Sequence, residues 1–408
     1  MALGLAAFST GQHDVRDRVV LKTGKEFRGR IAAPYDAQAL VIMRGGLRQR
    51  AERSKVAEIE LVGDKIRLFL ERRLQMRNQP RAQWFLVEWA QSQQLPNFAR
   101  LQAMLMVLES GDERAREFLG HRQRRGEWQW PHDGGWYSQT NLEKRIINSP
   151  LKLEGERFRL TCNSNLTSNI KALFDLERTA VWWYDNYGEA LGLLEALEPV
   201  EIAVMRDATR FQRWGFRPMP YYALSAYGGQ ARTFYTGANL KRPKLLFYTG
   251  AQGLLYRSLI GDFIPQDDST RICPWLEVGL PMLAQQVFAG EPGYATPGPL
   301  KPEDRKALEA LERDYRLTHL LHLPMYGGFY LMNDAPTNVN WSAATMFVQY
   351  LLDDNNQPAT RQAFFAYAHS ALAERKGDSS SLFDRAMGRP VEEFEKPFRA
   401  WLRKVANL

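Results

Sequence analysis

The spacing of hydrophobic residues changes period along this chain of 408 residues, so no single regular architecture accommodates all of it. Residues 15–62 consist of short β-branched runs that are separated by the turn signals Thr23-Gly24-Lys25, Pro34-Tyr35-Asp36 and Gly45-Gly46. From Asp64 onward the apolar residues recur at three- and four-residue steps, which is the period of a helix. This change predicts a domain boundary near residue 63 and a multidomain α+β protein.

The first segment, residues 14–63, predicts about five short strands and therefore a small β-barrel. The stretch "LKTGKEFRGRI" (21–31) resembles the first hairpin of SH3-like or Sm-like barrels, with Gly24 in the turn and Gly29 where the strand bends. Such barrels are used too widely for the resemblance to indicate a function.

Residues 64–125 predict helical hairpins. The stretch "WAQSQQLPNFARLQAMLMVLESGDERAREFLGHR" (89–122) resembles one degenerate tetratricopeptide-type unit, with Ala99 and Ala115 at close helix approaches. A single unit cannot bury its own apolar face, so we expect a spacer that leans on a neighbouring domain. A peptide-binding groove is the alternative.

Residues 126–149 form a tryptophan-rich segment in which Trp128, Trp130 and Trp136 surround Pro131 and a Gly-Gly pair. Aromatic residues in a turn-rich segment predict a β-hairpin that packs on a domain surface. The alternative is an aromatic platform that stacks on carbohydrate.

Residues 150–408 predict a large domain in which a strand-rich half precedes a helical half. Alternating or continuous apolar runs predict strands, and three- and four-residue steps predict helices. The expected strands are 151–166, 199–207, 221–237 and 243–250, and the expected helices are 168–188, 253–260, 274–283 and, after a loop rich in Pro and Gly (290–302), a series from 303 to the end.

Three stretches in this domain carry a resemblance to a known family. They are "PWLEVGLPML" (274–283), "NWSAATMFVQYLLDD" (340–354) and "LFDRAMGRPVEEFEKPFRAWL" (382–402), in which Gly388 ends one helix and an acidic stretch begins the last. Their order and spacing resemble the peptidase-MA-like metallopeptidases of the gluzincin type. The resemblance implies a mixed sheet, a zinc-binding helix, a second ligand helix and an all-helical C-terminal half.

The same resemblance shows which metal ligands are missing. In that family an HExxH helix supplies two His ligands and a general base, and a Glu on the next helix supplies the third ligand. Here the resemblance places Tyr256 and Ile260 at the two His positions, Arg257 at the base and Val278 at the third ligand. Ile and Val offer no lone pair, and an arginine repels a dication. We therefore predict no zinc cofactor and no catalytic residue at these four vestigial positions.

Glu277 lies one residue before the expected third ligand. One helical step is about 100°, so we expect its side chain to point away from the former metal site. It remains a candidate for contact with a ligand in the cleft.

These residues predict a catalytically inactive metallopeptidase-like protein that acts in binding or scaffolding of peptide or protein partners. The predicted cleft contacts are Trp275, Glu277, Phe234 and Tyr235, with the strand 231–237 or its neighbour as the sheet edge that accepts a peptide. One alternative is a hydrolase with a displaced metal or another nucleophile. His319 and His322, at i and i+3, have a spacing that can share a metal. A carbohydrate- or envelope-binding module that uses Trp128 to Trp136 is the other alternative.

The formal charge of +8 and the pI near 9.4 favour anionic partners. The basic residues are dispersed, and the densest clusters lack interleaved aromatic residues: 44–53, 71–77, 121–126 and 241–244. We therefore interpret them as solvated faces and predict no specific nucleic-acid site.

Residues 1–13 predict either a truncated signal peptide, which would place the protein in the cell envelope, or a disordered tail, which would leave it in the cytoplasm. No apolar run approaches the length that spans a bilayer. Cys162 and Cys273 can form one disulfide or serve as two buried small hydrophobes, and we favour the reduced form.

Overall fold

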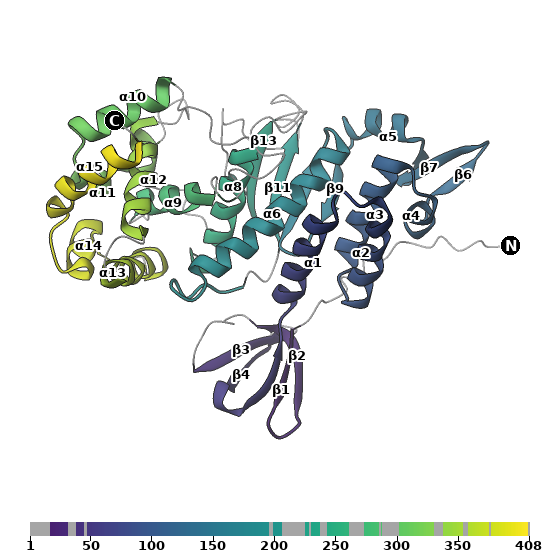
Figure 1. Cartoon of the computed structure of the whole chain (residues 1–408), viewed down its shortest axis with the longest axis horizontal. Coiled ribbons are helices and arrows are strands. Elements are labelled where there is room, and N and C mark those ends of the chain that lie inside the picture. The colour runs from purple at the N-terminus through teal and green to yellow at the C-terminus, as the bar shows by residue number, and fades with distance from the viewer. Residues whose placement is uncertain are drawn as a thin grey trace. The chain divides into compact units, whose positions relative to one another are not determined.

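The computed structural model confirms a mixed α+β protein (Figure 1). It divides into two compact units, of which the first comprises residues 1–31 and 38–119 and the second residues 32–37 and 120–408. The residues that the structure describes are 17–31, 38–44, 47–195, 199–205, 225–227, 230–236, 243–260, 273–284, 287, 302–329, 338–353, 358–374 and 377–406.

Five strands open the first unit, as the turn signals predict. They form one antiparallel sheet in the order β4-β3-β2-β1-β5 and comprise β1 (Asp17–Leu21), β2 (Glu26–Ile31), β3 (Ala39–Arg44), β4 (Leu47–Glu52) and β5 (Val56–Glu60). Val19, Leu40 and Ile42 form its buried core. A Cβ atom at Gly29 would lie 2.6 Å from the Met43 carbonyl oxygen, so glycine is required where β2 passes β3. Closure into an SH3-like barrel stays a prediction.

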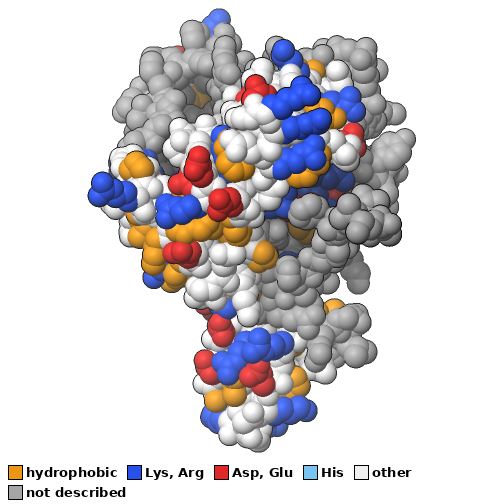
Figure 2. Space-filling view, turned by 90° about the vertical axis from the view of Figure 1, so that its right-hand side faces the viewer, with side chains coloured by type: hydrophobic (Ala, Val, Ile, Leu, Met, Phe, Trp, Pro, Cys, Tyr) orange, Lys and Arg blue, Asp and Glu red, His pale blue; other side chains and the backbone are white. Residues whose placement is uncertain are grey.

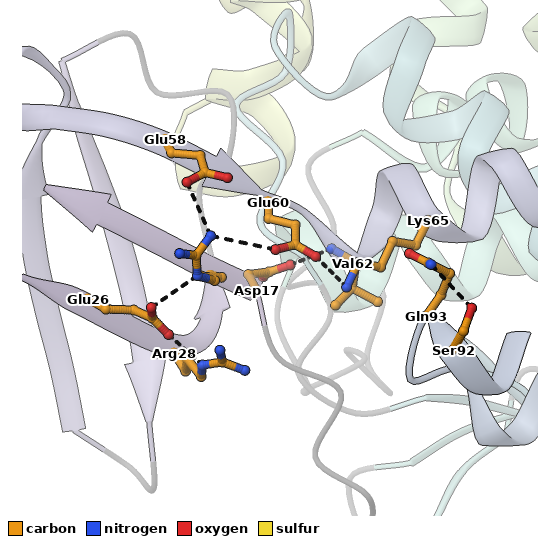
Figure 3. Close-up of polar contacts among 10 residues, drawn as sticks. Asp17, Glu26, Arg28, Glu58, Glu60, Val62, Lys65, Ser92 and Gln93 are labelled. Atoms are coloured by element: carbon orange, nitrogen blue, oxygen red, sulfur yellow. Dashed lines mark hydrogen bonds and ion pairs between the residues drawn. The ribbon is translucent and has the colours of Figure 1, made fainter. Parts of the chain in front are cut away.

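A buried aspartate connects this sheet to the first helix. The Asp17 carboxylate accepts hydrogen bonds from the backbone N–H groups of Ile31 (2.7 Å) and Val62 (2.8 Å). Next to it, Arg18 pairs with Glu26 (3.0 Å) and Glu58 (3.1 Å), and Figure 3 shows these carboxylates around one guanidinium. Because these ion pairs are partly exposed, they add little to the free energy of unfolding. Asp17 matters more, because without its carboxylate the N–H groups of Ile31 and Val62 would lose their hydrogen-bond acceptor.

Four helices complete the first unit: α1 (Val62–Met76), α2 (Pro80–Ser92), α3 (Pro96–Ser110) and α4 (Glu113–Phe118). They pack in sequence as hairpins, with Phe69 of α1 against Phe98 of α3 at a ring distance of 5.0 Å. Ala99 and Ala115 are fully buried, as expected for close helix approaches. The tetratricopeptide-like character of this segment stays a prediction.

The second unit begins with a small ribbon of three antiparallel strands in the order β6-β7-β8. The strands are β6 (Arg122–Arg124), β7 (Glu127–His132) and β8 (Gly135–Tyr137), and α5 (Gln139–Ile146) follows. The predicted hairpin is therefore present and carries one more strand.

A five-stranded sheet in the order β12-β13-β11-β10-β9 lies at the centre of the second unit. Its three inner strands are parallel, and both outer strands are antiparallel to them. The strands are β9 (Leu151–Glu154), β10 (Phe158–Cys162), β11 (Val200–Met205), β12 (Ser225–Tyr227) and β13 (Gln230–Thr236). The helices α6 (Leu166–Tyr187) and α8 (Pro243–Leu255) pack against each other and against this sheet.

The prediction of a strand at 243–250 is wrong, because this segment is the first part of α8. A short apolar run has no periodicity that separates a buried strand from a buried helix. Leu246, Phe247 and Ala251 are all buried, as a helix enclosed on most sides requires.

The C-terminal half is helical, as predicted. Its helices are α9 (Pro274–Leu283), α10 (Pro302–Arg313), α11 (Leu317–His322), α12 (Asn338–Leu352), α13 (Pro358–His369), α14 (Ser379–Met387) and α15 (Glu392–Ala406). Gly388 has a φ of 70° and ends α14, as expected. Among the described residues, no helix has the length and apolar character needed to span a membrane.

A buried glutamate on α6 holds the turn between β9 and β10. The Glu177 Oε1 atom accepts hydrogen bonds from the backbone N–H groups of Glu156 (2.8 Å), Arg157 (2.8 Å) and Phe158 (3.2 Å). A Cβ atom at Gly155 would collide with that oxygen, so only glycine fits there. Burial raises the pKa of Glu177 to about 6, although Arg157 and the three amides favour the charged form.

This shift predicts a specific pH dependence of stability. The folded protein binds the Glu177 proton more tightly than the unfolded chain does, because an exposed glutamate has an ordinary pKa of about 4.5. The contribution of Glu177 to the free energy of unfolding is therefore fully present below the unfolded pKa of about 4.5. This free energy falls by roughly 2 kcal/mol as the pH rises through about 6. Urea unfolding of the wild type and of Glu177→Gln at pH 4 and pH 7 checks this. A constant difference between the two proteins would contradict it.

Candidate functional site

The end of α8 meets α9 at the positions where the resemblance places a former metal site. After Leu255 the helix widens into a π-helical turn at Tyr256–Ile260, a feature that is often found at functional sites. The Tyr256 hydroxyl donates a hydrogen bond of 2.5 Å to Glu277 Oε2, and both residues are buried. Gln252 of α8 donates to the backbone carbonyl of Glu277 at 3.4 Å. The two helices therefore meet through a buried polar contact.

The orientation of Glu277 differs from the expectation. We expected it to point away from the former metal site, but its carboxylate contacts the first vestigial position. The apolar side chain of Val278 is fully buried in the core. The Glu277 carboxylate, in contrast, points toward the Tyr256 hydroxyl. The physical reason is that a buried carboxylate needs a hydrogen-bond donor.

The other two expected positions at the end of α8, Arg257 and Ile260, lie in the same π-helical turn. Arg257 follows Tyr256 in the π-helical turn and is partly buried. The backbone of Ile260 ends that turn, and its side chain lies outside the described part of the structure. The hydrogen bond between the two helices therefore joins Tyr256 with Glu277, the residue that precedes the expected third-ligand position, Val278.

Trp275 belongs to the core rather than to a cleft surface. Its side chain is fully buried, and its indole Nε1 donates to the Tyr367 hydroxyl at 3.2 Å. The two rings stack with an interplanar angle of 22°. Because no part of this ring is exposed, the expectation that Trp275 contacts a ligand is corrected.

The same buried cluster contains one of the two cysteines. The Cys273 Sγ atom lies 2.9 Å from the Tyr367 hydroxyl and 3.1 Å from Ser379 Oγ. Cys162 and Cys273 are both free, and burial raises the pKa of each thiol to about 12. Neither thiol is therefore poised to act as a nucleophile.

The strand that carries Phe234 and Tyr235 is an interior strand. β13 pairs with β11 on one side and with β12 on the other, so β12 is the edge strand on this side of the sheet among the described residues. Of the two strands that we considered as edges, the neighbour is the correct one. The side chains of Phe234 and Tyr235, like residue 237, lie outside the described part.

The three tryptophans of the ribbon do not form one platform. Trp128 and Trp130 lie on one face of β7, whereas Trp136 pairs with Pro131 and so lies on the opposite face. Trp130 is buried against His121 at a ring distance of 4.1 Å. The carbohydrate-stacking alternative therefore loses the continuous aromatic surface on which it depends.

His319 and His322 make separate contacts. His319 packs on Tyr315 at 6.0 Å between ring centres. His322 Nε2 lies 2.9 Å from Ser380 Oγ, and its Nδ1 lies 3.7 Å from Asp378 Oδ1. This places a serine, a histidine and an aspartate in the order of a catalytic triad, a juxtaposition that the sequence did not reveal because it joins α11 with α14. Within the described ranges, no three His, Cys, Asp or Glu residues are placed to hold a metal ion.

No family model, curated protein or solved structure matches this chain.

The Tyr256–Glu277 contact can be tested by removing one hydroxyl. Tyr256→Phe takes away a buried donor from the Glu277 carboxylate, so we expect the free energy of unfolding to fall by about 1–3 kcal/mol. Tyr187→Phe is the matched control, because Tyr187 is buried and its hydroxyl makes no hydrogen bond to the described residues. Urea unfolding measures both. Equal effects of the two variants would show that the contact contributes nothing.

Proposed function

We propose that this chain is a catalytically inactive relative of the peptidase-MA-like metallopeptidases and acts as a binding or scaffold protein for peptide or protein partners. The observation that supports this most directly is the hydrogen bond between Tyr256 and Glu277. It joins the first of the two expected His positions to the residue that precedes the expected third-ligand position, Val278.

The residues at these positions do not fit a zinc ion. A catalytic zinc site needs three protein ligands and one open position. Of the residues on these two helices, Glu277 alone carries a good ligand at the contact, and its carboxylate accepts from Tyr256. Tyr256 would have to lose a proton whose ordinary pKa is about 10, and Val278 has no donor atom. These residues therefore do not support a catalytic step through a zinc ion.

Peptide binding does not need the metal. An extended peptide can add to the edge of a sheet through main-chain hydrogen bonds, and this mode of binding does not depend on hydrolysis. The outer strand β12 (Ser225–Tyr227) is the candidate edge, because it is the strand that lies outside β13. The proposed partner is accordingly an extended peptide segment rather than a small molecule.

Metal content and proteolysis test this proposal. We expect the purified wild type to carry no stoichiometric zinc by elemental analysis and to show no chelator-sensitive cleavage of unfolded casein. Stoichiometric zinc together with such cleavage would overturn the proposal.

Restoration of the ligands tests the register separately. Tyr256→His, Arg257→Glu and Ile260→His together should create a zinc site that uses the native Glu277 as third ligand, because Glu277 already reaches position 256. Adding Glu277→Gln to this triple variant should abolish zinc binding. If the folded triple variant binds no zinc, or binds it only with Val278→Glu, the assigned register is wrong.

A second candidate, a serine hydrolase, is favoured by the contacts around His322. In such a reaction Ser380 Oγ attacks an ester carbonyl while its proton passes to His322 Nε2 and then to the leaving alcohol, and water later releases the acyl group. Asp378 would orient the imidazole, but the side chains of His322 and Asp378 are 56% and 52% exposed, which weakens their contact.

A fluorophosphonate probe tests this second candidate. If it is correct, the probe labels the wild type and Ser92→Ala, which changes an exposed serine of α2, but not Ser380→Ala. Absence of labelling in the wild type would leave the binding function as the sole proposal.

A further inference from the structure

The β6–β7 hairpin carries a group of exposed arginines at and near its tip. Arg122, Arg124 and Arg125 are all exposed. The side chains of Arg124 and Arg125 form no ion pair or hydrogen bond with any other described residue. Figure 2 faces the side that bears β6 and β7 in Figure 1 and shows several Lys and Arg side chains there, next to hydrophobic and acidic ones. In a protein with a formal charge of +8, this tip is a concentrated cationic surface.

The hairpin turn determines the direction of these side chains. Arg125 and Gly126 have φ angles of 53° and 82°, the signature of a tight two-residue turn that Arg124 and Glu127 close. Because side chains alternate along a strand, Arg122 and Arg124 share one face with Trp136. The Arg122 guanidinium lies 4.2 Å from the centre of the Trp136 ring and donates to Gln129 at 3.1 Å. Arg122 is thus held in place.

The backbone of β6 is also available for pairing. β6 is an outer strand of its sheet in the described part of the chain. In a two-residue hairpin the closing pair exchanges hydrogen bonds, so the backbone groups of the next residue, Gln123, point away from β7. The edge therefore offers one N–H donor and one carbonyl acceptor between two arginines.

We propose that this β6 edge binds an acidic, extended segment of a partner protein. Arg122 and Arg124 are two residues apart on a strand, which separates them by about 7 Å, the spacing of alternate side chains in any extended peptide. Carboxylates at alternate positions of such a peptide would face both guanidinium groups, which bind carboxylates in a bidentate manner. Gln123 would supply the main-chain hydrogen bonds of an added strand.

Two other classes of partner fit these observations less well. A nucleic-acid base would need an open aromatic face, but Arg122 covers one face of Trp136. A membrane surface would require apolar side chains at the tip, whereas the tip consists of Arg124, Arg125 and Gly126. Glu127, opposite Arg124, makes no ion pair with it and leaves its guanidinium available. This site shares no residue with the Tyr256–Glu277 contact, so the two proposals stand or fall separately.

Fluorescence anisotropy with a labelled peptide of alternating Glu and Thr tests the proposal on the full chain. Binding should weaken by about tenfold in the double variant Arg122→Gln/Arg124→Gln, the loss of two exposed ion pairs. The matched control is Arg77→Gln/Arg81→Gln, which removes the same charge from exposed positions outside the ribbon and should bind as the wild type does. Circular dichroism verifies that both variants are folded.

Three further measurements discriminate between partners. A peptide of the same composition with its Glu residues in one block should bind less tightly, because its charges do not match the arginine spacing. Hydrogen exchange of the Gln123 amide should slow when the alternating peptide is added. The proposal is overturned if the double variant binds normally, if the block peptide binds equally well, or if a single-stranded oligonucleotide competes through the same two arginines.

Discussion

Burial of a carboxylate without a hydrogen-bond donor lowers the stability of the folded state. The buried Glu277 carboxylate has a donor in the Tyr256 hydroxyl. Together with the hydrogen bond from Gln252 to the Glu277 carbonyl, this contact joins α8, which packs on the central sheet, to α9, which packs on α12. A Cβ atom at Gly279 would lie 2.7 Å from the Ala344 carbonyl oxygen, so α9 also approaches α12 closely. The tyrosine–glutamate pair therefore lies at the junction between the strand-rich and helical halves of the second unit.

The central sheet depends on a comparable device. Glu177 of α6 binds three consecutive amides in the turn before β10, and Gly155 leaves the space for its carboxylate. In both places an acidic side chain on a helix holds a neighbouring segment through donors that would otherwise be buried alone. Such contacts are directional, so they specify position more strictly than apolar packing does.

The two proposed binding surfaces differ in how they would recognise a partner. At β12 the main chain would supply the affinity, and the proposal rests on the topology of the sheet. At β6 the charge pattern would supply the specificity, since Arg122 is already ordered by Trp136. Recognition at the second surface would depend on exposed charges, so the proposed binding would weaken as the salt concentration rises.

The sequence by itself determined the features that depend on local spacing. These are the five strands before residue 62, the helices that follow them, the helical C-terminal half, and the glycines at positions 29 and 388, each of which meets a close approach or a positive φ. Only the tertiary structure decided that 243–250 is a helix, because a short buried apolar run has no periodicity that distinguishes a strand from a helix. Likewise, the partner of Glu277, the opposite faces of Trp130 and Trp136, and the meeting of His322 with Ser380 depend on which segments lie side by side. No repeating sequence pattern predicts such long-range pairings, since each arises from a single contact between residues that are distant in the sequence.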